Sequence, residues 1–224
     1  MEDAVIKKST GAAGLDTLLG GGIESRMITQ FFGEAGSGKS TLCLMAAVEV
    51  LRKGGGVVYI DSEGFSIERF SQIAGDSTNE YAKHLYVFEP STFAEQGLMI
   101  SESERLIKSG TAGMIILDSA TALYRVEQMD TKGALSMLSR QMMVLLGIAK
   151  RYDIPVVITN QVFMDIDHHR LSGLGGTALS HISKAIIRVE KHEGFRRLVV
   201  FKHRSQAEGK SWEFILTGTG VRDR

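Results

Sequence analysis

The residues best suited to chemistry stand close together near the start of the chain, in the stretch GEAGSGKS at residues 33–40. Its glycines let backbone amides turn inward around an anion, and the helix predicted to follow presents its positive end to that anion. Lys39 can then reach the β- and γ-phosphates of a nucleotide. A chance glycine-rich turn is disfavoured, because the motif lies between a strand pattern and a helix pattern. The predicted nucleotide-binding loop comprises Gly33, Glu34, Ala35, Gly36, Ser37, Gly38, Lys39, Ser40 and Thr41.

A second candidate for nucleotide chemistry is Asp118, which ends the apolar run MIILD at residues 114–118. A carboxylate at the end of a buried strand can hold a magnesium-bound water opposite the hydroxyl of Ser40. Many parallel strands end in aspartate, so this residue alone indicates little. Its pairing with the phosphate-binding loop favours the metal role. We therefore predict that Ser40 and Asp118 hold Mg²⁺.

Two further polar groups follow apolar runs and could act on the phosphates. Glu63 comes just after VVYID at residues 57–61, at the mouth of a predicted strand, where a carboxylate could activate water. Asp61, at the strand end, is interpreted as bracing the turn. Gln161 closes PVVITNQ at residues 155–161 and could sense the terminal phosphate. The structural alternatives, a solvated turn glutamate and a strand-end amide bonded to backbone, stay open on these residues alone.

The spacing of apolar residues along the chain predicts the strands and helices that hold these candidate residues. Short β-branched runs predict buried parallel strands at residues 28–32, 57–61, 114–118 and 155–161. Proline-free stretches with apolar residues at helical spacing predict crossover helices at residues 40–53, 93–109 and 135–152. After Gly176, the strand-like runs AIIRVEK, RRLVVFKHR and WEFILTG alternate with short polar turns. The expected fold class is α/β, a mostly parallel twisted sheet flanked by helices, with a C-terminal antiparallel β meander.

Length and composition narrow the class of protein further. The 224 residues suffice for one well-buried domain, which we expect over residues 1–224. Lysines and arginines (26) equal aspartates and glutamates (26), so any nucleic-acid contact has to come from local basic loops. The one cysteine, Cys43, cannot form an intramolecular disulfide and is expected to be buried in a helix. No run approaches the roughly 18 apolar residues of a membrane span, so we expect a cytoplasmic protein without membrane contact.

Four ordered motifs resemble those of the RecA/RadA recombinase superfamily and cover nearly the whole chain: STGAAGLDTLLGGGIESRMITQFFGEAGSGKST, VVYIDSEG, MIILDSATALYR and PVVITNQV. The likeness is greatest to the short archaeal RadA paralogues, because the chain begins almost at the ATPase core. The resemblance implies a RecA-like P-loop ATPase core that binds ATP and Mg²⁺, with no N-terminal helix-hairpin-helix domain. It implies that Lys39 and Glu63 are catalytic. Gln161 then matches the γ-phosphate sensor, and Arg69 matches an arginine that packs near adenine.

The same resemblance points to two segments that would face DNA. Residues 124–141 and 162–176 match the two DNA-facing loops of the recombinases. The possible phosphate contacts in them are Arg125, Lys132, His168, His169 and Arg170. Solvated loop charge is the alternative, since neither segment is strongly basic.

The last strand pattern departs from the recombinases. It ends in Lys202-His203-Arg204, where RadA-like proteins carry an acidic, proline-containing cap over the ATP of a neighbouring subunit. A Lys-x-Arg at a strand end resembles the trans-acting fingers of KaiC-like and ring-helicase ATPases. Alternate residues of a strand share a face, so Lys202 and Arg204 are expected to point together. The alternative is a solvent-facing basic strand edge that discourages aggregation.

These features predict an accessory ATPase of DNA repair and homologous recombination. We expect it to bind ATP and Mg²⁺, to hydrolyse ATP weakly, to touch single-stranded or branched DNA, and to modulate a RadA-type recombinase. A homo-oligomer is expected if Lys202 and Arg204 act on a neighbouring subunit. Two alternatives stay open: an autonomous recombinase that forms filaments on single-stranded DNA, and a KaiC-like regulatory ATPase without a DNA role.

Overall fold

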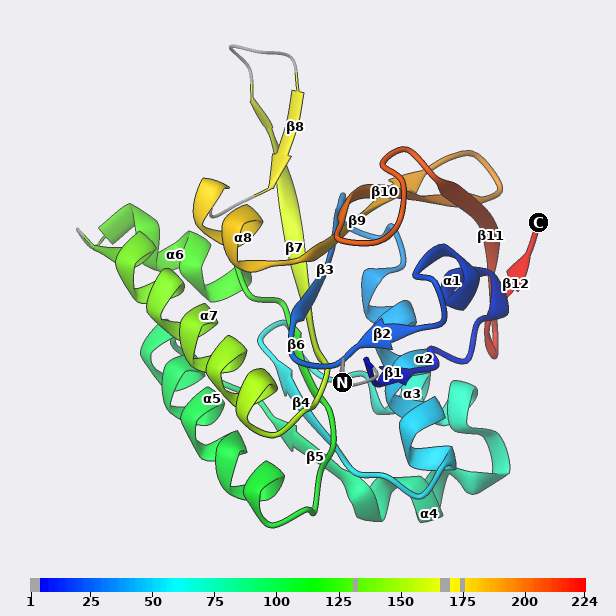
Figure 1. Ribbon diagram of the computed structural model, residues 1–224, viewed down its shortest axis with the longest axis horizontal. Helices are drawn as coiled ribbons and strands as arrows, with labels where there is room; N and C mark the ends of the chain where they lie inside the picture. The colour runs from blue at the N-terminus through cyan, green and yellow to red at the C-terminus, as the bar shows by residue number, and fades with distance from the viewer. Residues whose placement is uncertain (1–4, 131–132, 166–169, 174–175) are drawn as a thin grey trace.

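The structure, a computed structural model, describes residues 5–130, 133–165, 170–173 and 176–224 (Figure 1). The described part of the chain forms a ten-stranded sheet with helices on both faces. From one edge to the other its strands are β12 (Gly220–Asp223), β11 (Ser211–Thr217), β10 (Arg196–His203), β9 (Ala185–Lys191), β3 (Ile28–Gly33), β7 (Val156–Asp165), β6 (Ile115–Asp118), β4 (Val57–Asp61) and β5 (Leu85–Phe88), with β8 (Arg170–Gly173) paired to β7 outside this order.

The middle of the sheet is parallel because helices connect its strands. Every pair from β9 through β3, β7, β6 and β4 to β5 is parallel, and β9 to β12 run antiparallel to one another. All residues of β3, β4 and β6 are buried, as expected for apolar strands covered on both faces. The predicted α/β fold with a C-terminal antiparallel meander is therefore confirmed.

The helices divide into two groups, one on each face of the sheet (Figure 1). One face carries α1 (Ala13–Leu18), α2 (Lys39–Arg52), α3 (Ile67–Ala74) and α4 (Thr78–Tyr81), the last flanked by the 3₁₀ turns Gly75–Ser77 and Ala82–His84. The other face carries α5 (Phe93–Lys108), α6 (Ala122–Asp130), α7 (Ala134–Arg151) and α8 (Gly176–Ile182). The predicted helices correspond to α2, α5 and α7, and Cys43 is buried in α2. In the part of the chain that the structure describes, no helix is long and apolar enough to cross a membrane.

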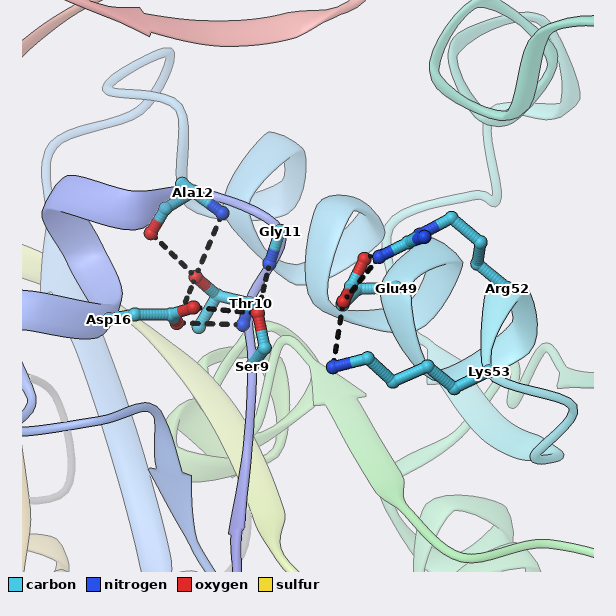
Figure 2. A network of polar contacts seen from close by, with 8 residues as sticks. All are labelled: Ser9, Thr10, Gly11, Ala12, Asp16, Glu49, Arg52 and Lys53. Carbon is cyan, nitrogen blue, oxygen red and sulfur yellow. Dashed lines mark hydrogen bonds and ion pairs between the residues drawn. The ribbon is translucent and has the colours of Figure 1, made fainter.

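Two separate sets of polar contacts lie where the segment before α1 passes the far end of α2, one within residues 9–16 and one among Glu49, Arg52 and Lys53 (Figure 2). Asp16 accepts hydrogen bonds from the Ser9 hydroxyl (2.6 Å) and from the amide and hydroxyl of Thr10 (2.8 and 2.7 Å). Gly11, at φ 78°, lies directly against Glu49 of α2, where an added Cβ would come within 3.4 Å of the Glu49 Cβ. A small sheet of β1 (Lys7–Lys8) and β2 (Ile23–Glu24) completes this region. The segment before α1 thus packs closely against the end of α2 opposite the phosphate loop.

Candidate functional site

The glycine-rich loop connects the end of β3 to the start of α2, as predicted. Gly36 (φ 68°) and Gly38 (φ 102°) adopt left-handed backbone that favours glycine. A Cβ on Gly33 would lie 2.2 Å from the Val189 carbonyl oxygen, so only glycine fits beside β9. No side chain caps the N-terminus of α2. Its first amides are therefore available to an anion, which the helix dipole also favours.

Lys39 is folded back onto its own loop. Its Nζ donates to the carbonyls of Gly33 (3.0 Å) and Glu34 (2.8 Å), and the residue is 8% exposed. Burial lowers the pKa of the Lys39 ammonium from its ordinary value, while the carboxylates of Asp118 and Glu63 oppose that shift. The three groups therefore lie close enough to interact electrostatically.

The loop contains one buried polar atom that a ligand could satisfy. Ser37 is fully buried, and its Oγ has no hydrogen-bond partner among the described residues. Buried hydroxyls are normally paired, so this one fits a loop built around a phosphate. Ser40, in the first turn of α2, is exposed and free to hold a cation. The remaining predicted loop residues are exposed or partly exposed, namely Glu34, Ala35, Gly36, Gly38 and Thr41.

Asp118 ends β6, is 4% exposed, and is held by two hydroxyl groups. Thr159 Oγ1 donates to its Oδ1 at 2.6 Å, and the Tyr59 hydroxyl donates to its Oδ2 at 2.9 Å. Burial, with Asp118 nearby, raises the pKa of the Tyr59 hydroxyl well above its ordinary value, so this group stays protonated and donates. In the described ranges, no group of three or more His, Cys, Asp or Glu side chains is arranged so that it could hold a metal ion. A single carboxylate with one hydroxyl suits Mg²⁺, which takes few protein ligands and several from phosphate and water.

The turn after β4 brings the proposed base and the proposed sensor together. Asp61 Oδ1 accepts from the amides of Glu63 (2.8 Å) and Gly64 (2.9 Å), which confirms that it braces the turn. Burial raises the pKa of Asp61 to about 6, with contributions from Asp118 and Glu63, although the two amide bonds oppose the shift. Gln161 Nε2 donates to Glu63 Oε1 at 2.7 Å. The proposed base Glu63 and the proposed sensor Gln161 are therefore hydrogen-bonded to each other.

Arg69 binds the turn between β11 and β12. Its guanidinium donates to the carbonyls of Gly218 (2.8 Å) and Thr217 (2.9 Å), and more weakly to that of Gly220 (3.4 Å). Strand β11 also flanks the phosphate loop, because a Cβ on Gly38 would lie 3.1 Å from a Leu216 methyl. Arg69 thus holds a wall of the candidate site, and its packing near adenine stays a prediction.

The described residues of the two segments expected to match DNA-facing loops lie largely in helices and strands, and their contact with DNA stays a prediction. Residues 124–141 include most of α6 and the first half of α7, where Gln141 is buried and bonded to Gln96 (2.8 Å). Residues 162–176 include the end of β7 and all of β8, which pair antiparallel and extend beyond the rest of the sheet (Figure 1). Strand β7 continues four residues past Gln161, because residues 162–165 pair with β8.

The predicted DNA contacts can be located only in part. Arg125 is exposed on α6. Arg170 begins β8, opposite Asp165 of β7. Lys132, His168 and His169 lie outside the described residues. DNA contact by these residues stays a prediction.

Lys202 and Arg204 contact different elements of their own chain. Lys202 Nζ donates to the carbonyls of Ser180 (2.5 Å) and Ser183 (3.0 Å) at the end of α8. Arg204 Nε lies 2.6 Å from Glu24 Oε2 of β2. Strand β10 also ends at His203, so the alternation of faces assumed from the sequence does not extend to Arg204. The pair therefore does not present two unpaired cations, and a trans role would require these contacts to be released.

The sequence interpretation missed Tyr59 and Thr159. Each is a polar residue inside an apolar strand, two positions before a residue that was selected, Asp61 or Gln161. Residues two apart on a strand share a face, so this spacing was a usable signal. Arg196 was also missed; its Nη2 approaches the Gly36 carbonyl at 3.4 Å from the meander side of the loop.

The parallel sheet, the loop between β3 and α2, and the polar strand ends define a RecA-like α/β fold with a P-loop. The chain belongs to the Rad51 family, whose model matches residues 1–224. Membership of this family implies, in general, ATPase activity, binding of ATP with Mg²⁺, and DNA binding.

The relatives and the solved structure that the chain resembles agree with this family. It is similar to the "DNA repair and recombination protein RadB" of Methanoculleus marisnigri, with 57% identity over 216 residues and 96% of each chain covered. The protein of the same name from Methanococcoides burtonii is 48% identical over 212 residues, covering 93% of this chain and 94% of the relative. A solved structure described as "Crystal structure of the RadB recombinase" superposes with a TM-score of 0.85 at 36% identity, covering 97% of this chain and 99% of that one.

Proposed function

We propose that this chain is an accessory ATPase of homologous recombination that binds ATP with Mg²⁺, hydrolyses it slowly, binds single-stranded or branched DNA, and modulates a RadA-type recombinase. The observation that carries the nucleotide part is the convergence of polar groups along one edge of the four adjacent parallel strands, where Gln161 of β7 pairs with Gly33 at the end of β3. The phosphate loop follows β3, Gln161 lies on β7, Asp118 ends β6 and Glu63 follows β4. Ligands of open α/β sheets bind at this edge.

Nucleotide binding would exchange contacts within the loop for contacts to phosphate. Lys39 would give up the carbonyls of Gly33 and Glu34, and Ser37 Oγ would gain a partner. Bound Mg²⁺ neutralises charge on the β- and γ-phosphates. Ser40 and Asp118 are the residues that we propose hold it.

Glu63 is the proposed general base, and its contact with Gln161 supports a gated, slow reaction. The carboxylate is held at 2.7 Å by the same amide that would sense the terminal phosphate. Transfer of that amide to phosphate would release Glu63 to accept a proton from water. Binding of phosphate by Gln161 would then control whether Glu63 can act as the base.

The contacts of Lys202 and Arg204 also support slow turnover by the isolated chain. A cationic finger from a neighbouring subunit is worth roughly 10³–10⁵ in rate. Both candidate cations are bound within their own chain here. If they serve a neighbouring copy in a homo-oligomer, turnover per chain should rise with protein concentration. A turnover number independent of concentration, in protein shown to associate, would reject the trans role.

Family membership supports the recombination part of the proposal over a KaiC-like regulatory ATPase without a DNA role. The accessory role is tested by measuring ATP turnover and strand exchange in parallel, with the chain alone, with single-stranded DNA, and with a RadA-type recombinase. We expect slow turnover, no strand exchange by the chain alone, and a changed exchange rate for the recombinase. Robust strand exchange by the chain alone would contradict the accessory role and support the autonomous recombinase.

A further inference from the structure

The carboxylate of Asp118 accepts hydrogen bonds from hydroxyl groups of both neighbouring strands. Tyr59 lies on β4 and Thr159 on β7, and these two strands flank β6 in the sheet. The Tyr59 hydroxyl donates to Oδ2 at 2.9 Å and Thr159 Oγ1 donates to Oδ1 at 2.6 Å. Each carboxylate oxygen therefore has one hydroxyl donor, and the donors come from separate strands.

Both donors are buried in the sheet. Tyr59 is 1% exposed and Thr159 is 0% exposed, in strands whose surrounding residues are packed on both faces. Hydrogen bonds to an ionised carboxylate are about twice as strong as neutral ones. Rotation of the Asp118 carboxyl would break both of these bonds inside the core, where an unpaired hydroxyl is costly. The two bonds therefore favour the observed orientation of the carboxylate.

We propose that Tyr59 and Thr159 are positioning residues that orient the Asp118 carboxylate toward Mg²⁺, so that the affinity of the site for the metal depends on two hydroxyl groups that do not touch it. This inference rests on the proposed nucleotide function. A competing explanation is that the two hydroxyls only compensate the buried charge of Asp118 and thereby support the fold. The two explanations differ in what Mg²⁺ concentration does to the variants.

The experiment uses Tyr59→Phe, Thr159→Val and the double variant, which remove the donors and nearly preserve side-chain volume. Binding of a fluorescent ADP analogue is measured by titrating Mg²⁺, and separately in EDTA. Outer-shell partners of metal ligands are typically worth 10–100-fold in metal affinity. We expect the Mg²⁺ concentration at half-saturation to rise roughly 10-fold in the double variant, with the affinity measured in EDTA unchanged within about twofold.

Matched controls come from buried hydroxyl groups elsewhere in the protein. Tyr124→Phe removes the hydroxyl of a buried tyrosine that packs against Phe93 on the other face of the sheet. Thr29→Val removes a buried hydroxyl of β3 that has no hydrogen-bond partner among the described residues. Both should titrate with Mg²⁺ as the wild type does. Thr159→Ser, which keeps the donor, should restore the wild-type Mg²⁺ requirement.

Each outcome bears on one of the two claims. If the wild-type chain shows no Mg²⁺-dependent nucleotide binding, the proposed function fails. If the wild type binds but Tyr59→Phe and Thr159→Val keep its Mg²⁺ requirement, only the positioning role is rejected. An equal loss of affinity with Mg²⁺ and in EDTA would assign the hydroxyls to the fold and also reject positioning. Circular dichroism identifies any variant that fails to fold, in which case Thr159→Ser against Thr159→Ala decides the question.

Discussion

The edge of the parallel strands where we propose that nucleotide binds differs from the candidate DNA-facing segments in how its polar side chains are held. At the nucleotide edge, Lys39, Asp118 and Thr159 are buried and joined to fixed partners over 2.6–3.0 Å. In the candidate DNA-facing segments, Arg125 is an exposed side chain on α6. The buried groups of the first region have their partners without a ligand, whereas the proposed DNA contact of Arg125 would depend on the charge of one exposed side chain. Substitutions should therefore have large, specific effects in the first region and small, salt-dependent ones in the second.

The largest expected effect is at Glu63. Glu63→Gln keeps an acceptor for the Gln161 amide but removes the proposed base, which typically contributes 10²–10⁴-fold. ATP turnover should fall by roughly that factor while nucleotide affinity stays within about threefold. Single-turnover hydrolysis and equilibrium binding measure the two separately. Glu68→Gln, at an exposed position of α3, is the control, and turnover above a tenth of wild type in Glu63→Gln would remove Glu63 from the mechanism.

The next effect is on nucleotide affinity at Lys39. Removing one partner of a desolvated charge pair costs about 2–5 kcal/mol, so Lys39→Ala should weaken ATP binding by roughly 30-fold or more. Circular dichroism should show an intact fold. Lys53→Ala is the matched control, because Lys53 pairs with Glu49 at the other end of α2. Equal affinities for wild type and Lys39→Ala would overturn the phosphate site.

The next prediction concerns the effect of Asp61 on how stability changes with pH. Its pKa is raised from 3.8 to about 6 in the fold, so the folded state binds this proton more tightly than the unfolded state does. Its contribution to stability is fully present below pH 3.8 and is lost as pH rises through about 6. Asp61→Asn keeps an acceptor for the turn amides and removes the charge.

In metal-free and nucleotide-free protein, the Asp61→Asn variant should therefore be more stable than wild type by about 1–3 kcal/mol at pH 8. The gain should shrink at pH 4.5. Denaturant unfolding at the two pH values measures it, and Asp76→Asn, at an exposed position, should show no such difference. A gain that is equal at both pH values would mean that the buried charge of Asp61 is not the cause.

The smallest expected effect is at Arg125. Arg125→Ala should weaken binding of single-stranded DNA only a few-fold and lower the slope of log affinity against log salt by about 1. Fluorescence anisotropy at several salt concentrations measures both quantities. Arg105→Ala, on the exposed side of α5, is the control. Identical salt slopes for wild type and Arg125→Ala would place the DNA contact elsewhere.

Local pattern was enough to predict much of this molecule. The buried parallel strands, the helices α2, α5 and α7, the meander and the phosphate loop all follow from apolar periodicity and from glycine and lysine at fixed spacing. The bracing of the turn by Asp61 was also predictable, because its partners are two and three residues away. These features depend on neighbours in the chain, so one sequence specifies them.

The remaining features depend on the order of the strands. Gln161 meets Glu63 across 98 residues, and Tyr59 meets Asp118 across 59, because β7, β6 and β4 are adjacent. The glycines and lysine of the loop after β3 were enough to predict a phosphate site from the chain alone. The hydroxyl groups that bond to Asp118, and the contacts of Lys202 at the end of α8, became visible only in the folded chain. Such contacts depend on strand order and register, which no local pattern encodes.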